Sequence, residues 1–255
     1  MGDLDGFLSP ARSLGSPARF LDEPGSTNDD AKRWASEGAP HGALVHAERQ
    51  TRGRGRLGRA WRSPPGENLC LSLVLRPTLA PSAAPTVALA AGLGLAEAVE
   101  RFLPVAATVK WPNDVRVGGL KVAGVLVEGA LRGASLEYVV LGVGLNVRGE
   151  APPPGLEASA TTLRAVRGRD LSRAEVLGAV LLALEARLGT LFTEGLEALL
   201  PALSARCDTL GRRVTVGDET GLAESLAPDG ALVLLRDDAS RVAVYAGDVV
   251  PAQGS

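Results

Sequence analysis

The segment TVKWPNDVRVGGLKVAGVLVE, residues 108–128, predicts an antiparallel strand pair, and with it the centre of a sheet. Its first apolar residues form a strand that ends at a Pro-Asn-Asp turn, and the Gly-Gly pair is a hairpin signal. The chain returns so that Lys121 opens a second apolar strand. Lys110, Lys121 and Asp114 therefore share one strand pair. There they either bind an anion, with the carboxylate helping to hold Mg²⁺, or they are ordinary surface ions.

Further strands and helices are predicted on both sides of this segment. Apolar runs of strand length predict the strands, and a capping box before a long apolar run predicts the start of a helix. The predicted strands are Phe20-Leu21, Ala43–Ala47, Leu69–Leu75 and Glu137–Val147, and the predicted helices are Asp30–Glu37, Thr86–Phe102, Ser172–Phe192 and Glu194–Ala205. Helices and strands mixed in this order predict an α/β (α+β) fold.

The sequence pattern changes after residue 206. Short alternating strands there are separated by turn signals rich in Gly, Pro and Asp. They cover residues 213–217, 221–227, 231–236 and 241–246. We therefore expect two domains, a larger one over residues 1–206 and a small β-barrel over residues 207–255.

The composition excludes several classes of function. A net charge of −2 gives no global basic field for nucleic acid. Cys70 and Cys207 are far apart in sequence, so no zinc or disulfide pattern is present. No apolar leader opens the sequence, and residues 83–99 read as too short and too broken to span a bilayer. We expect a cytoplasmic protein with no transition metal, no DNA partner and no membrane anchor.

A loop rich in glycine and arginine, residues 49–67, carries the densest chemical signal. It contains GRGRLGR at residues 53–59, where glycines admit a ligand to the backbone and arginines match carboxylate or phosphate. The spacing does not fit a P-loop. Because like charges repel, we expect the loop to be mobile until an anion orders it. A solvated basic loop and a nucleic-acid patch are the alternatives at this point.

Two other segments suggest ligand contacts. Ser26-Thr27-Asn28 precedes a predicted helix, where these residues serve as caps, as hydrogen-bond partners of a polar ligand, or as both. The run Gly142-Val-Gly144-Leu-Asn146 ends a strong strand, which indicates either a bulge or a ligand lying against the backbone. No helix follows these glycines, so a Rossmann motif is excluded.

Taken in order, these segments resemble the biotin protein ligases. The matching motifs are Gly25-Ser-Thr-Asn28, Gln50-Thr-Arg-Gly-Arg-Gly-Arg-Leu-Gly-Arg-Ala-Trp61, Asn68-Leu-Cys-Leu-Ser72, Lys110-Trp-Pro-Asn-Asp114, Lys121-Val-Ala-Gly-Val-Leu-Val-Glu128 and Gly142-Val-Gly-Leu-Asn146. The resemblance implies a catalytic core related to class II aminoacyl-tRNA synthetases and an SH3-like barrel after it. The sequence is similar to the monofunctional class, which lacks a DNA-binding domain.

The resemblance also implies the site residues. The implied catalytic residues are Lys121, Arg54 and Arg56. Those implied to bind biotin are Ser26, Thr27, Asn28, Gln50, Arg54, Gly55, Arg56, Trp61, Lys121, Gly124 and Gly144. Those implied to bind ATP are Gly53, Arg54, Arg59, Lys110, Asn113 and Asn146, with Asp114 as a ligand of Mg²⁺.

By resemblance, the chain makes biotinyl-5′-AMP from biotin and ATP and transfers biotin to a lysine of a biotin carboxyl carrier domain of an acyl-CoA carboxylase. Three alternatives are open from the sequence: a lipoate or octanoate protein ligase of the same fold, a nucleic-acid-binding regulator, and a pure biotin-binding module. Arg52 and Leu57 depart from the usual residues of the loop, which bears on retention of the intermediate. A homodimer is also left open.

Overall fold

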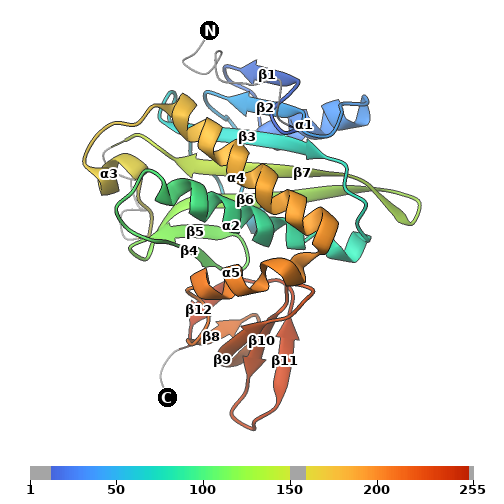
Figure 1. Ribbon diagram of the computed structural model, residues 1–255, viewed down its shortest axis with the longest axis vertical. Helices are drawn as coiled ribbons and strands as arrows, with labels where there is room; N and C mark the ends of the chain where they lie inside the picture. The colour runs from blue at the N-terminus through green and yellow to red at the C-terminus, as the bar shows by residue number, and fades with distance from the viewer. Residues whose placement is uncertain (1–12, 150–158, 253–255) are drawn as a thin grey trace.

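In the computed structural model, which describes residues 13–149 and 159–252, the chain forms a seven-stranded sheet and a smaller five-stranded sheet (Figure 1). The strand order of the large sheet is β1-β2-β3-β7-β6-β5-β4. Its strands are β1 (Ala18–Leu21), β2 (Leu44–Ala47), β3 (Asn68–Leu75), β4 (Ala107–Lys110), β5 (Asp114–Val117), β6 (Leu120–Arg132) and β7 (Ser135–Asn146). Strands β1 and β2 are parallel and the other neighbours antiparallel, which confirms the predicted mixed architecture.

The register of β6 and β7 aligns three glycines. Gly124 lies opposite Gly144, and Gly142 lies two residues further along β7. Because side chains alternate between the two faces of a sheet, all three glycines leave the same face bare. This bare strip gives a ring or a ligand direct access to the backbone.

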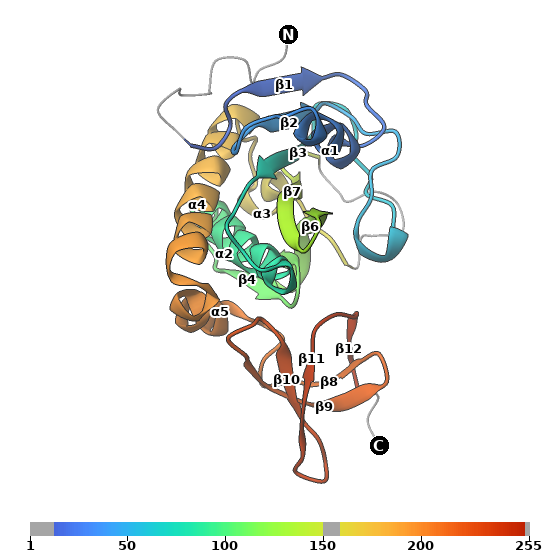
Figure 2. The ribbon, with the colours of Figure 1, turned by 90° about the vertical axis from the view of Figure 1, so that its right-hand side faces the viewer.

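Helices cover the two faces of the large sheet unequally. On one face, α2 (Thr86–Glu100) and α4 (Arg173–Glu194) pack against each other and over the main core, whereas α1 (Thr27–Ser36) lies on the other face (Figure 2). The alternation in β3 fits this division, because Leu73 joins the main core and Val74 joins the small core under α1. The short α1 leaves most of its own face uncovered, and the glycine strip lies there.

The C-terminal segment forms the small antiparallel β domain that the sequence predicts. Its strand order is β11-β10-β9-β8-β12. The strands are β8 (Arg213–Val216), β9 (Glu219–Leu226), β10 (Leu232–Leu235), β11 (Arg241–Val244) and β12 (Val249–Pro251). Trp111 joins the two sheets, because its buried indole Nε1–H donates a hydrogen bond to the Gly230 carbonyl at 3.0 Å.

Several short elements differ from the prediction. The helix expected over Glu194–Ala205 is interrupted, because Gly195 adopts a φ of 82° and Pro201 starts a new helix. The result is η3 (Leu196–Leu199) followed by α5 (Leu200–Arg206). Further unpredicted elements are η1 (Arg56–Gly58), η2 (Pro81–Ala83), α3 (Leu163–Arg167), β12 and β5. All are three to five residues long, too short for a periodic pattern to reveal. Because β5 lies between β4 and β6, Lys110 and Lys121 are on two strands that do not pair, and the expected single strand pair is wrong.

Two helical segments, Pro81–Glu100 and Arg173–Glu194, are long and apolar enough to cross a membrane by length and composition alone. The reading of residues 83–99 as too short and too broken to span a bilayer is therefore wrong on length and composition. In the fold, the two segments pack on each other and on the large sheet (Figure 1). Core helices of a packed domain pass the same test.

The closest approach of these two helices generates a stability prediction. A Cβ on Gly94 of α2 would lie 3.0 Å from the Ala183 carbonyl oxygen of α4, whereas one on Gly189 of α4 would meet nothing within 4 Å. We expect Gly94→Ala to lower the free energy of unfolding by about 1 kcal/mol, since overpacking of about 1–3 kcal/mol exceeds the gain in helix propensity.

Gly189→Ala is the matched control and should raise the free energy of unfolding by about 0.5–1 kcal/mol. Urea denaturation of both variants measures the difference. Equal stabilisation by the two substitutions would contradict this account of the helix contact.

Candidate active site

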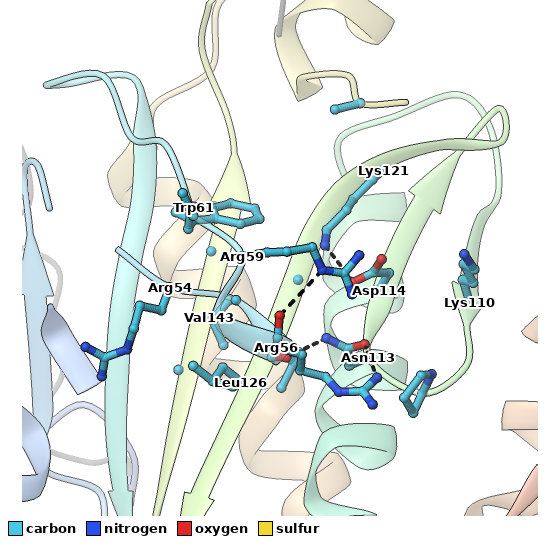
Figure 3. Close-up of a pocket in the computed structure, with 18 of the residues that line it drawn as sticks. Arg54, Arg56, Arg59, Trp61, Lys110, Asn113, Asp114, Lys121, Leu126 and Val143 are labelled. Carbon is cyan, nitrogen blue, oxygen red and sulfur yellow. Dashed lines mark hydrogen bonds and ion pairs between the residues drawn. The ribbon is translucent and has the colours of Figure 1, made fainter. Parts of the chain in front are cut away.

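A cavity of about 400 Å³ lies over the glycine strip, between the large sheet, the arginine loop and the small β domain (Figure 3). Every site residue predicted from the sequence except Gly53 lines it. Lining residues that the prediction did not include are Ala60, Arg62, Leu71, Trp111, Pro112, Arg116, Val125, Leu126, Gly142, Val143, Ser159, Ala160, Gly247, Asp248, Val249 and Val250. Segments far apart in sequence thus share one cavity.

One end of the cavity is polar and uncharged. The backbone N–H and the hydroxyl of Thr27 both donate to Gln50 Oε1, at 2.8 and 3.1 Å. Ser72 Oγ lies 2.8 Å from Thr27 Oγ1 and 2.6 Å from Asn28 Oδ1. Ser26 occupies the N-cap position of α1 but makes no side-chain capping bond, so its hydroxyl is not committed to the helix. This end suits a ligand head with amide-like donors and acceptors.

The glycine strip forms the floor of the cavity. A Cβ on Gly144 would lie 2.3 Å from Trp61 Cε2, and a Cβ on Gly142 would lie 2.1 Å from Asn28 Oδ1. Real Cβ atoms do not approach other atoms so closely, so glycine is required at both positions. Trp61 therefore lies directly on the β7 backbone, and the sequence signal of glycines within a strand is explained by close contact rather than by a bulge.

The other end of the cavity is cationic. Lys121 Nζ lies 2.7 Å from Asp114 Oδ1 and 5.6 Å from the centroid of the Trp61 ring. Arg56 extends from the loop and donates to Asn113 Oδ1 at 3.1 Å, and Figure 3 shows its guanidinium beside Asn113, with the guanidinium of Arg59 nearer to Lys121 and Asp114. Two cations from distant segments are thus held by the adjacent residues Asn113 and Asp114, and both line the cavity, where an anionic group could contact them.

Arg54 behaves differently from the other predicted cations. Its guanidinium makes two hydrogen bonds to the Asp29 carboxylate, each 2.7 Å long. Figure 3 shows the side chain directed away from Arg56 and Lys121. The hydrogen bonds from Arg54 lower the pKa of Asp29 well below its usual value, so the pair is fully charged at neutral pH. The structure therefore brings Arg56 and Lys121 together, while Arg54 is engaged by a carboxylate of α1.

The arginine loop has its own hydrogen-bonded structure. Trp61 N–H donates to the Gly53 carbonyl at 2.9 Å, and Gly55 N–H donates to the Arg59 carbonyl at 2.7 Å. Leu57, at the tip, has a φ of 56° and is 72% exposed. The loop is therefore a small hairpin that carries Arg56 near its tip, and protein carboxylates already offset part of the charge repulsion expected from the sequence.

The small β domain closes the cationic end. Arg59 forms an ion pair with Asp248, and Arg56 lies 3.5 Å from the Gly247 carbonyl oxygen. No feature of the sequence around residues 247–250 signals this role, because it depends on the docking of the second sheet. The contribution of these residues can be seen only in the folded structure.

Lys110 is placed to meet a second anionic group. Within residues 13–149 and 159–252 its amino group has no hydrogen-bond or ion-pair partner. Burial, together with the nearby positive charge of Arg116, lowers its pKa. A half-buried ammonium of this kind favours an anionic ligand, which would restore the lost interactions.

The donor set of the site does not form a resident metal centre. In the part of the chain that the structure describes, no three His, Cys, Asp or Glu side chains cluster as metal ligands. Asp114, the predicted ligand of Mg²⁺, is paired with Lys121. One carboxylate together with phosphate oxygens and water is nevertheless a usual environment for Mg²⁺. The residues present therefore fit an ion that arrives with a phosphate ligand.

Sequence reasoning missed the residues that hold the predicted ones in place. Asp29 binds Arg54, Ser72 contacts Asn28, and Glu128 accepts a hydrogen bond from the Asn28 amide at 2.7 Å. Glu128 was visible as an acidic residue that ends an apolar run. Asp29 carried no distinct signal, because acidic residues are common in the first turn of a helix.

Comparison with known proteins finds matches along both parts of the chain. Residues 22–146 match the Biotin/lipoate A/B protein ligase family, and residues 209–250 match the Biotin protein ligase C terminal domain. The biotin--[acetyl-CoA-carboxylase] ligase of Mycobacterium tuberculosis is 37% identical over 250 residues, which covers 92% of this chain and 90% of that protein. The bifunctional ligase/repressor of Bacillus subtilis is 30% identical over 242 residues, covering 92% and 74%.

Solved structures agree with these matches. The biotin protein ligase of Aquifex aeolicus in complex with biotin and ATP has a TM-score of 0.79 at 30% identity, and covers 92% of this chain and 98% of that chain. The Leishmania major ligase in complex with biotinyl-5-AMP has a TM-score of 0.63 at 25% identity, covering 91% and 100%.

The contact between Trp61 and Gly144 generates a prediction about the loop. We expect Gly144→Ala to expel the indole and to increase tryptic cleavage at the loop arginines by about fivefold to a hundredfold. Overpacking costs about 1–3 kcal/mol, and cleavage follows the population of the open loop. Time-resolved proteolysis with mass spectrometry measures the rate.

Gly129→Ala on β6 is the control, because its Cβ would meet the tip of the Leu136 side chain at 3.2 Å and the Tyr138 carbonyl oxygen at an ordinary contact distance of 3.7 Å. Wild-type cleavage rates in both variants would show that Trp61 does not hold the loop.

Proposed function

This chain belongs to the biotin protein ligase family and catalyses the ATP-dependent ligation of biotin to protein, and on that premise we propose how its residues divide the work. The observation that supports the division is a single cavity with an uncharged polar end and a cationic end, about 400 Å³ in volume. A molecule with a polar ring at one end and a carboxylate at the other matches this arrangement.

The polar end is proposed to hold the ureido ring of biotin. Thr27, Asn28 and Gln50 present hydroxyl and amide groups there, and the side chains of Thr27 and Asn28 are only 3% exposed. Buried polar groups of this kind discriminate strongly against ligands that leave them unpaired. A dithiolane ring offers no such donors or acceptors, and therefore a lipoate ligase fits this end poorly.

The cationic end is proposed to carry the adenylation step. The biotin carboxylate attacks the α-phosphorus of ATP, the bond from the α-phosphorus to the bridging oxygen breaks, and pyrophosphate leaves. Negative charge gathers on the α-phosphoryl oxygens during this step, and Lys121 and Arg56 offset it. Asp114 and Asn113 hold these two cations at 2.7 and 3.1 Å, so little reorganisation is needed when the ligands bind.

The nucleotide is proposed to extend from this centre toward the small β domain. Lys110 and Arg59 line that side of the cavity, together with Asn113 and Asn146. Within the described residues the Lys110 amino group has no hydrogen-bond or ion-pair partner, which suits the leaving pyrophosphate. Mg²⁺ would arrive with the nucleotide and neutralise phosphate charge, and Asp114, a carboxylate that lines the cavity, would be its ligand from the protein.

The second step needs a nucleophile from outside the chain. We propose a lysine of a biotin carboxyl carrier domain of an acyl-CoA carboxylase, consistent with the names of the Mycobacterium tuberculosis and Paracoccus denitrificans relatives. Its amine attacks the carbonyl of the adenylate, the bond to the phosphate oxygen breaks, AMP leaves, and the amine loses a proton. A cytoplasmic location follows from such a partner.

Isothermal titration of biotin, with and without ATP, tests the proposed activity. We expect biotin to bind alone and mass spectrometry to detect biotinyl-5′-AMP once ATP is added. Lipoate is the matched control and should neither bind nor be adenylated. Adenylation of lipoate in place of biotin would overturn the assignment.

Substitution of Lys121 tests the cationic end. We expect Lys121→Ala to slow pyrophosphate release by about a hundredfold to a thousandfold, which corresponds to one lost preorganised contact. Arg132→Ala is the control, because Arg132 pairs with Glu137 at the far end of β6. Full activity of Lys121→Ala would defeat the assignment.

Limited proteolysis tests whether ligands order the loop. Trypsin should cleave between Arg49 and Arg62 in the free protein, and biotin plus ATP should protect these sites because Arg56 then gains an anionic partner. Unchanged cleavage with both ligands present would count against ordering of the loop by the intermediate.

A further inference from the structure

Four side chains of alternating charge run from the arginine loop to the polar end of the cavity. Arg54 binds Asp29 through two hydrogen bonds of 2.7 Å. Lys32 Nζ lies 3.1 Å from Asp29 Oδ1 and 2.7 Å from Glu128 Oε1. Glu128 then accepts a hydrogen bond from Asn28 Nδ2 at 2.7 Å. The five residues connect the base of the loop, helix α1 and strand β6 without a gap.

We propose that Asp29, Lys32 and Glu128 are positioning residues that couple the orientation of Asn28 to the placement of the loop through Arg54. The inference rests on the proposed function, because it takes Asn28 as a partner of biotin and Arg56 as a partner of the carboxylate and phosphate. In this arrangement Arg54 anchors the loop, and Arg56 and Lys121 meet the reacting groups.

The contacts of Asn28 fix its side-chain carboxamide in one orientation. Its Nδ2 is held by Glu128 and its Oδ1 lies 2.6 Å from Ser72 Oγ. The same oxygen fills the space above Gly142, where a Cβ would lie 2.1 Å away. Loss of the Glu128 carboxylate would therefore release the amide and the contact that it makes at the polar end.

At the opposite end of this row of four charged side chains, the contacts of Arg54 connect the row to the arginine loop. Arg54 forms a β-bridge with Ala60, so fixing its side chain fixes the base of the hairpin that presents Arg56. Two parallel hydrogen bonds from a guanidinium to one carboxylate set both distance and angle. A lysine at this position could not set both.

The shifted pKa values of Asp29 and Lys32 keep both groups charged at neutral pH. Arg54 lowers the pKa of Asp29, and hydrogen bonds to Glu128 and Asp29 raise the pKa of Lys32 although burial opposes the rise. The side chains are 28–36% exposed, so any one pair contributes little to stability. The expected role is placement of the site residues and not stability of the fold.

A double-mutant cycle on the full-length protein tests the proposal. We expect Asp29→Asn and Glu128→Gln each to raise the KM for biotin in the pyrophosphate-release assay by about fivefold to tenfold, with a smaller change in kcat. The double variant should be little worse than either single variant, because groups in one network are not additive. Asp29→Glu should recover part of the loss, and apo Asp29→Asn should be cleaved faster in the loop.

The matched control is Asp30→Asn, which breaks the ion pair of Asp30 with Arg33 on the same helix at 3.0 Å. It should leave the KM for biotin and loop cleavage unchanged, and its melting temperature should match that of Asp29→Asn. Equal kinetics for the Asp29→Asn and Asp30→Asn variants, or strictly additive losses in the cycle, would overturn the proposal. Failure of the wild-type protein to form the adenylate would instead overturn the proposed function.

Discussion

The rest of the site depends on the absence of side chains from one patch of the β6–β7 pair. With a Cβ on Gly144 or Gly142, neither Trp61 nor Asn28 could occupy its position, since the nearest atoms would be 2.3 and 2.1 Å away. Trp61 lies in the arginine loop and Asn28 in the first turn of α1, so these two contacts place both walls of the cavity against one strand. The hydrophobic core lies mainly on the opposite face, under α2 and α4. The face that carries the chemistry therefore holds only the small core under α1, and the glycine strip beside that core is left for the cavity.

Ion pairs with protein carboxylates allow an open site to hold several cations close together. Lys121 is paired with Asp114, Arg59 with Asp248 and Arg54 with Asp29. Such half-exposed pairs are individually weak, so an anionic substrate can compete for the cation at small cost. Of the three pairs, only that of Arg54 points away from the reacting centre, and it is also the only one made by two hydrogen bonds to one carboxylate. Anchoring and substrate binding are thus divided among arginines that look alike in sequence.

The sequence predicted the parts of this structure that local pattern controls. Long strands, the two long helices and the Gly-Gly hairpin were correct, because apolar periodicity and turn chemistry operate within a few residues. Every residue that the motifs assigned to the site, except Gly53, lines the cavity, whereas half of the lining, including all of its residues from the small β domain, was not predicted. The pairing of Arg54 with Asp29 and the contribution of Asp248 could not be predicted, because both depend on which carboxylate the folded chain brings near a given arginine. The split of the helix predicted over Glu194–Ala205 into η3 and α5 was missed, because apolar periodicity over so few residues does not separate a 3-10 turn from an α-helix.

The turn after β4 shows why the small β domain is part of the catalytic design. Three residues of this turn face three different structural units. Trp111 donates to Gly230 of the small domain, Asn113 accepts from Arg56 of the loop, and Asp114 holds Lys121 of β6. A shift of the small domain would therefore move the turn, and the turn would move both cations of the reacting centre. Under the proposed function, a misplacement of about 1 Å can cost about a hundredfold in rate, so we expect the docking of the second sheet to affect catalysis even where it touches no reacting atom.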